Sequence, residues 1–208
     1  MNEDEKWLIN LCKTETLLYS DPYSKENLRI MKELVLNVSE NIDKNLLYVF
    51  INHLNNYYLL NLSENYDDLR KELFDSYKFM FEKGFFTLND KPFISYSEYR
   101  SVLHISAGLE NFEWSERFIE YFKDMFKNEK KEYIYDYSNA LLCYVKKKYQ
   151  DSLKIISNIH PREQIEKIDI DILRLKIFYE LDYFDSSISV INSLRYYIYN
   201  NSNLNKEI

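Results

Sequence analysis

Glycine, proline and cysteine are scarce in this sequence. Its 208 residues include only 2 glycines, 3 prolines and 2 cysteines. Sheets and βα units need turn residues at every reversal, so this scarcity favours helices joined by short polar loops. No stretch alternates convincingly between polar and apolar residues, as the strands of a half-buried sheet do. These absences predict an all-α protein.

Several classes of function lack their characteristic sequence features. The net charge is −7 at pH 7 and no clustered basic footprint is present, so we expect no nucleic-acid partner. The longest apolar run, Leu46–Ile51, is far too short to cross a membrane. The acidic first residues lack the basic region of a signal peptide. The distant Cys12 and Cys143 form no C-x-x-C motif and indicate reduced thiols. We therefore expect a soluble, cytoplasmic protein.

Catalytic and metal-binding motifs are also missing. His53, His104 and His160 are far apart, and none has a second ligand at a spacing that suits a metal. The two glycines stand alone and form no phosphate-binding loop. We therefore expect no enzymatic activity, no metal and no cofactor.

An aromatic residue followed three residues later by serine recurs in the C-terminal half. These pairs lie 37 and then 35 residues apart: Phe112 with Ser115, Tyr149 with Ser152, and Phe184 with Ser187. Apolar residues follow each aromatic residue at matching offsets, and a weaker copy is centred on Tyr66. The pattern predicts about five antiparallel helical hairpins within a single domain of residues 1–208: 3–40, 44–83, 95–127, 133–159 and 163–199.

One hairpin carries a resemblance to a known family. The segment Tyr149–Leu153, with Ala140 nine residues before Tyr149, resembles the tetratricopeptide repeat. The family's first-helix tryptophan and Leu-Gly pair are missing, and Lys147 and Asp182 stand where its turn glycine would. The resemblance covers roughly residues 44–200 and implies a right-handed α-α superhelix, or solenoid. The stretch from Tyr179 is also similar to bacterial helical-repeat proteins of unassigned role.

The resemblance also implies a concave groove lined by the first helix of each hairpin. Its candidate partner-binding residues are Arg100, His104, Tyr137, Leu141, Tyr144, Lys176 and Tyr179. Tyrosines with basic residues at the edges suit a peptide or helix that carries apolar and acidic groups. Equally, Tyr137, Tyr144 and Tyr179 could pack between neighbouring hairpins. We expect Arg100, His104 and Lys176 to be exposed.

We therefore expect a non-catalytic scaffold or adaptor that binds a protein or peptide partner. One alternative is a regulator in which a ligand shifts the packing of the hairpins. An RNA-binding repeat is a further alternative, although Arg100, Tyr137 and Ile172 form no recurring code. An enzyme would require buried carboxylates clustered around His104. The polar tail after Tyr199 either caps the last hairpin or indicates that the chain is a piece of a longer protein.

Overall fold

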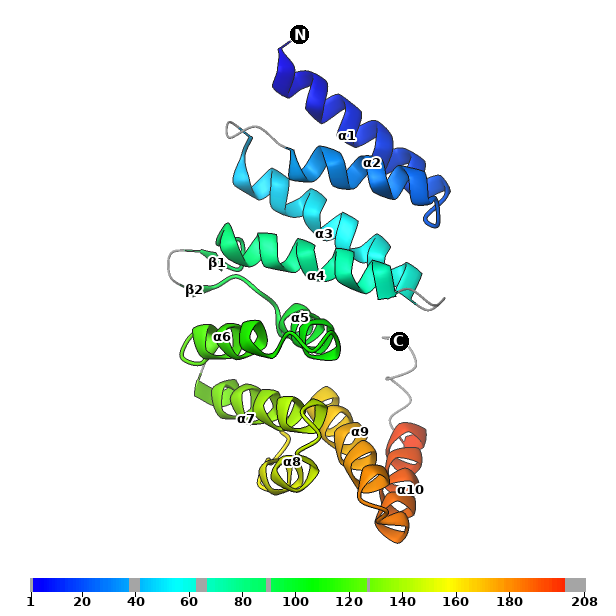
Figure 1. The fold of residues 1–208 in the computed structure, drawn as a ribbon, viewed down its shortest axis with the longest axis vertical. Coiled ribbons are helices and arrows are strands. Elements are labelled where there is room, and N and C mark those ends of the chain that lie inside the picture. Colours follow the sequence, from blue (N-terminus) through cyan, green and yellow to red (C-terminus); the bar gives the residue numbers. More distant parts are fainter. Residues whose placement is uncertain (1, 38–41, 63–66, 89–90, 127, 201–208) are drawn as a thin grey trace. The chain divides into compact units, whose positions relative to one another are not determined.

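The computed structural model describes residues 2–37, 42–62, 67–88, 91–126 and 128–200 (Figure 1). In these ranges the chain forms ten helices and one short two-stranded ladder. It divides into two compact units, residues 1–105 and 106–208. The single domain of residues 1–208 stays a prediction. Several predicted features lie outside the described residues, namely residues 38–40 and 127, Tyr66, and the tail beyond residue 200.

The first unit is built from consecutive helices that pack on one another. They are α1 (Glu3–Ser20), α2 (Lys25–Leu36), α3 (Lys44–Asn61), α4 (Asp67–Glu82) and all but the last residues of α5 (Tyr96–Gly108). α1 contacts α2, α2 contacts α3, and α3 contacts α4. Between α4 and α5, strand β1 (Thr87–Leu88) pairs antiparallel with β2 (Lys91–Pro92).

Polar side chains fix where the first helices begin. Asn2 and Glu5 form a reciprocal capping box at the start of α1. At α2, the Ser24 hydroxyl accepts a hydrogen bond from the Asn27 amide, 3.3 Å away. At α3, Asp43 accepts from two backbone amides of the first turn. These caps satisfy amide groups that have no partner within a helix.

The second unit contains the remaining helices and has the same consecutive packing. They are α6 (Phe112–Phe122), α7 (Asn128–Val145), α8 (Tyr149–Ile156), α9 (Gln164–Glu180) and α10 (Phe184–Asn200). α7 contacts both α8 and α9, which also contact each other, and α9 contacts α10. The predicted all-α class is confirmed, and the contacts between neighbouring helices are those of an α-solenoid. The right-handed sense of a superhelix stays a prediction.

The turns of the second unit repeat the same backbone conformation. Among the residues that the structure describes, three non-glycine residues have positive φ, and they lie 37 and then 35 residues apart: Glu110 (58°), Lys147 (61°) and Asp182 (58°). At Lys147, the amide donates to Tyr144 O and the next amide, of Lys148, donates to Cys143 O. This is a Schellman motif, and the same two hydrogen bonds recur at the other two turns. Lys147 and Asp182 therefore occupy the conformation that glycine adopts most easily.

The serines of the repeated pattern lie inside the helix pairs. Ser115 and Ser152 are both fully buried. The Ser152 hydroxyl donates to Ala140 O at 2.7 Å, so a small side chain lets α8 approach α7 closely. In α10 the packing is looser, because Ile191 is 40% exposed whereas its counterpart Ile156 in α8 is fully buried.

Candidate functional site: a groove between α2 and α4

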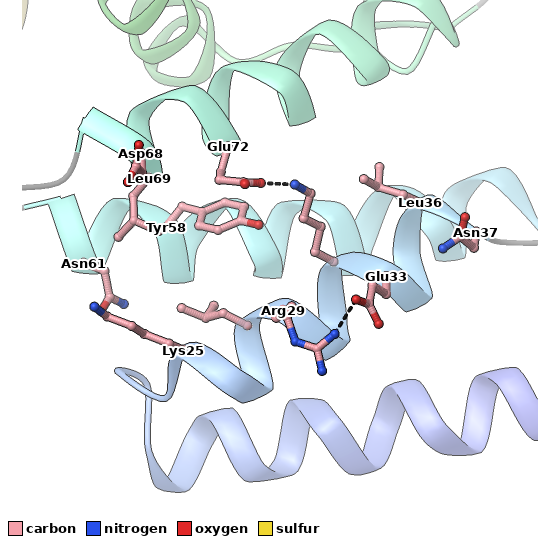
Figure 2. A pocket seen from close by; sticks show the side chains of 12 residues that line it. Lys25, Arg29, Glu33, Leu36, Asn37, Tyr58, Asn61, Asp68, Leu69 and Glu72 are labelled. Carbon is pink, nitrogen blue, oxygen red and sulfur yellow. Dashed lines mark hydrogen bonds and ion pairs between the residues drawn. The ribbon is translucent and has the colours of Figure 1, made fainter.

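A groove of about 540 Å³ lies in the first unit between α2 and α4, with α3 beneath it (Figure 2). Its apolar part is formed by Leu28, Leu36 and Leu69 together with the ring of Tyr58. Leu28 and Tyr58 are buried, while Leu36 and Leu69 are accessible at the edges. The volume falls within the range of ligand pockets in proteins.

One wall of the groove is the exposed face of α2. Lys25, Arg29 and Lys32 recur at helical spacing and line the groove beside Leu28. Glu33 is the acidic residue of α2 that lines it. This wall therefore carries more positive than negative charge.

The opposite wall, α4, is acidic. Asp68 and Glu72 line it and lie one helical turn apart. Glu72 of α4 forms an ion pair with Lys32 of α2 across the groove, and Figure 2 marks an ion pair of Glu72 with a dashed line. Both side chains of the pair remain about one third exposed. A partly exposed pair of this kind contributes only about 0–1 kcal/mol to stability.

Two residues of α3, Tyr58 and Asn61, line the floor of the groove. Asn61 donates through Nδ2 to Pro22 O at 3.0 Å and to Tyr57 O at 2.8 Å, which ties the end of α3 to the α1–α2 turn. Burial, with a smaller contribution from the charge of Glu72, raises the pKa of Tyr58 above its ordinary value. The phenol therefore stays neutral near pH 7.

Arg29 is held along the α2 wall by its own helix. Its Nη2 atom lies 2.8 Å from Glu26 Oε1, and it also pairs with Glu33. The hydrogen bond to Glu26, followed by the charges of Glu26 and Glu33, raises the pKa of Arg29. The same contact lowers the pKa of Glu26. Arg29 is thus a fixed positive charge at the rim of the groove.

The chemistry of the groove suits binding. Its described lining residues include no histidine, cysteine or serine that could act as a nucleophile paired with a base. Within the described part of the chain, no group of three or more metal-ligating side chains is placed to hold an ion. None of the described helices combines the length and apolarity needed to cross a bilayer.

Comparison with protein-family models, curated proteins and solved structures finds no match to this chain.

The residues that the sequence places in a concave groove have diverse environments. Arg100 and His104, in the first unit, are half-buried. In the second unit, Tyr137 and Leu141 are each only 4% exposed. The ring of Tyr137 stacks on that of Tyr133, with centroids 5.8 Å apart. A partner therefore cannot reach either buried side chain in this state, and the packing of Tyr137 between neighbouring hairpins stays a prediction.

The other predicted residues of the second unit are more accessible. Tyr144 is half-buried against Tyr149, with ring centroids 5.7 Å apart. Burial and the nearby charge of Glu180 raise the pKa of Tyr144. Lys176 is exposed, and Tyr179 is 69% exposed. Partner binding by these residues stays a prediction.

Sequence reasoning did not find the α2–α4 groove. The alternation of Leu28 and Leu36 with Lys25, Arg29 and Lys32 is visible in the sequence and marks one face of a helix. The sequence does not show which other helix lies opposite that face. Only the packing shows that α2 and α4 lie on either side of α3 and leave a gap between them.

Proposed function

We propose that this chain is a non-catalytic binding protein whose α2–α4 groove receives an amphipathic helix of a partner protein. The observation that carries the proposal is an apolar floor between a mainly basic wall and an acidic wall. A helix with an apolar stripe buries that stripe in such a groove. Acidic residues on one flank would face Arg29, and basic residues on the other would face Asp68.

The wider assignment belongs to the same proposal. We propose a tetratricopeptide-like repeat protein with a right-handed arrangement of about five hairpins, acting as a scaffold or adaptor in the cytoplasm. The recurrence of the turn conformation at Glu110, Lys147 and Asp182 supports the repeat class. Cys12 and Cys143 are free thiols, which is compatible with a reducing compartment.

The ion pair between Lys32 and Glu72 does not close the groove against such a helix. Opening this partly exposed pair costs only about 0–1 kcal/mol, because water can solvate both groups. A partner can replace it with two pairs of its own, a carboxylate opposite Lys32 and an ammonium opposite Glu72. Charge complementarity would then set which way the partner helix runs.

A designed peptide tests the proposal directly. The probe is a helix of about four turns with a leucine stripe, glutamates along one flank and lysines along the other. Its binding is measured by fluorescence anisotropy. The two control peptides carry glutamate on both flanks or lysine on both flanks. A peptide with its two flanks exchanged is not a suitable control, because it could bind in the reverse direction. We expect the peptide with glutamates on one flank and lysines on the other, called the mixed peptide, to bind more tightly than either control.

Matched leucine substitutions locate the binding site. Leu69→Asp places a charge in the groove, whereas Leu60→Asp places one on α3 at a leucine that is 55% exposed and does not line the groove. Leu69→Asp should weaken the mixed peptide by at least about tenfold, since it desolvates a charge on binding. Leu60→Asp should leave binding unchanged. Equal binding to both variants, with helicity intact, would remove the groove from the proposal.

A ligand-responsive regulator is the second candidate, and the volume of the groove favours it. A groove of about 540 Å³ is large enough for a small apolar molecule. A screen by thermal unfolding, run on wild type and Leu69→Asp, separates the two functions. A small molecule that raises the melting temperature of wild type alone, in a protein that does not bind the mixed peptide, would favour the regulator.

A further inference from the structure

A second pocket in the first unit has a different chemical character from the groove. It has a volume of about 270 Å³ and lies among α3, α4 and the start of α5. Asn52 and Asn56 line it from α3, and Ser97, Glu98 and Ser101 line it from α5. It shares no residue with the α2–α4 groove. Its accessible lining is polar and apolar in equal parts, whereas that of the groove is mainly apolar, and Glu98 is the charged residue among the described residues that form the pocket.

The two carboxylate oxygens of Glu98 differ in their hydrogen bonds. Oε2 accepts a hydrogen bond from the Tyr48 hydroxyl at 3.3 Å. Oε1 is buried and has no hydrogen-bond partner among the residues that the structure describes. Burial raises the pKa of Glu98, and hydrogen bonds from Tyr48 and the Ser95 backbone oppose that rise in part. A buried carboxylate oxygen without a donor is costly to the fold.

A structural role explains only part of this arrangement. The Glu98 amide donates to the Ser95 hydroxyl at 3.1 Å, so Ser95 caps α5. A capping glutamate needs one oxygen for the backbone and leaves the other free. The missing interaction requires a donor, and the side-chain amide of the neighbouring Asn55 donates through Nδ2 to Met80 Sδ at 3.3 Å. The described residues of the lining include no lysine or arginine that could balance the charge.

We propose that this pocket binds a primary alkylammonium group, with the half-buried carboxylate of Glu98 as its main hydrogen-bond acceptor. An ammonium group has three donors and no acceptor. Glu98 takes one donor, and the hydroxyl of Ser97 and the amide oxygen of Asn52 or Asn56 are available within the same lining for the others. The charge of the ligand would balance that of Glu98, which the protein leaves uncompensated in the pocket.

The pocket is large enough for this ligand. A water molecule occupies roughly 30 Å³ in the liquid, so about 270 Å³ accommodates a short alkylammonium with bound waters. Leu59 and the buried Tyr77 offer apolar surface to the alkyl chain. Two sources share this chemistry, a free small amine and the side chain of a lysine on another protein.

Titration calorimetry on the whole chain near pH 7.5, where a primary amine is protonated, tests the proposal. The probes are n-butylamine and lysine capped at both ends, and the uncharged controls are n-butanol and capped norleucine. We expect at least one amine to bind while both controls do not. Binding of n-butylamine indicates a site for free amines, whereas binding of capped lysine alone indicates a lysine side chain.

Two glutamate variants assign the site. Glu98→Gln keeps the shape of the side chain and removes its charge, and it should weaken amine binding at least about tenfold, as expected for losing a charge-assisted hydrogen bond. Glu82→Gln removes an exposed charge on α4 outside this pocket and should leave binding unchanged. Failure of both amines to bind overturns the proposal. Equal binding to wild type and Glu98→Gln, or equal binding of amine and alcohol, overturns it as well.

Discussion

Lys147 and Asp182 adopt the same left-handed backbone conformation, with φ of 61° and 58°, each two residues before the start of a helix. Their side chains share no chemistry that would favour this conformation at both places. The hydrogen bonds of the Schellman motif are common to the two turns. The repeat is thus preserved in backbone geometry where the residue type has changed.

Replacing Lys147 by glycine should stabilise the second unit. A left-handed conformation costs an ordinary L-residue about 1–2 kcal/mol, and the entropy cost of glycine offsets about half of that gain. Lys147→Gly should therefore raise the free energy of unfolding by up to about 1 kcal/mol. Asp182→Gly should gain less, because aspartate tolerates this conformation better than lysine does. Urea denaturation measures both, and Lys148→Gly, at a negative φ, should give no gain.

Ser152 should tolerate no larger side chain. It is fully buried and donates to Ala140 O, so Ser152→Leu forces α7 and α8 apart and should cost at least about 1–3 kcal/mol. Ser157→Leu, at an exposed serine just after α8, should change stability by less than about 0.5 kcal/mol. Denaturation curves for the two variants are compared. Similar stability losses would show that close approach of the helices is not the function of Ser152.

Alanine substitution should destabilise the protein strongly at Tyr137, a core residue, and only slightly at Tyr179, a surface residue. Tyr137→Ala removes a ring that is 4% exposed and stacked on Tyr133, and should cost about 3–5 kcal/mol, as other core aromatics do. Tyr179→Ala, at 69% exposure, should cost less than about 0.5 kcal/mol. Chemical denaturation followed by circular dichroism tests both. A large loss for Tyr179→Ala would contradict its surface position.

The repeated features could be predicted from the sequence because they are local. The aromatic-to-serine spacing placed Ser115 and Ser152, and the comparison with a turn glycine placed Lys147 and Asp182 at their turns. Each of these depends on residues within one hairpin. The short ladder between Thr87 and Pro92 was not predicted, because two paired residues on each side leave no periodic pattern.

The candidate sites were harder to predict because they depend on packing between hairpins. The same helical stripe can hold a buried Tyr137 and an accessible Tyr144, and periodicity alone does not separate the two. The groove requires α2 and α4 to remain apart above α3, which no local pattern encodes. The environment of Glu98 depends on Tyr48, fifty residues earlier in the chain.

Glu98 should make stability depend on pH in a definite direction. Its pKa in the folded chain is raised from the ordinary 4.5, so the folded state holds this proton more tightly than the unfolded state. Its favourable contribution is therefore complete below the unfolded pKa and is lost as pH rises through the folded pKa. Wild type loses this contribution to its free energy of unfolding as pH rises, whereas Glu98→Gln has no carboxyl group to lose a proton there. The stability of Glu98→Gln relative to wild type should therefore increase as pH rises above 4.5.

Urea denaturation at constant ionic strength, repeated across this pH window, measures the effect. Glu82→Gln serves as the control for removing one negative charge, since Glu82 is an exposed residue of α4. A stability difference between Glu98→Gln and wild type that falls as pH rises would mean that Glu98 is stabilised as a carboxylate.

The ion pair between Lys32 and Glu72 should contribute little to folding. A double-mutant cycle with Lys32→Gln and Glu72→Gln should give a coupling energy below about 1 kcal/mol, because both side chains are about one third exposed. Added salt should reduce that coupling further. A coupling of several kcal/mol would instead make the pair a structural clamp that keeps α2 and α4 together. Such a clamp would hinder entry of a partner helix.

The packing of consecutive helices also governs how the chain acquires its structure. The extensive contacts within each unit join helices that are neighbours, or next neighbours, along the chain. Such contacts close only short loops, and chains with this property fold rapidly. A hairpin can form while the ribosome is still adding the next one. An unfolded segment at one place would then leave distant hairpins folded, because each is supported mainly by its neighbours.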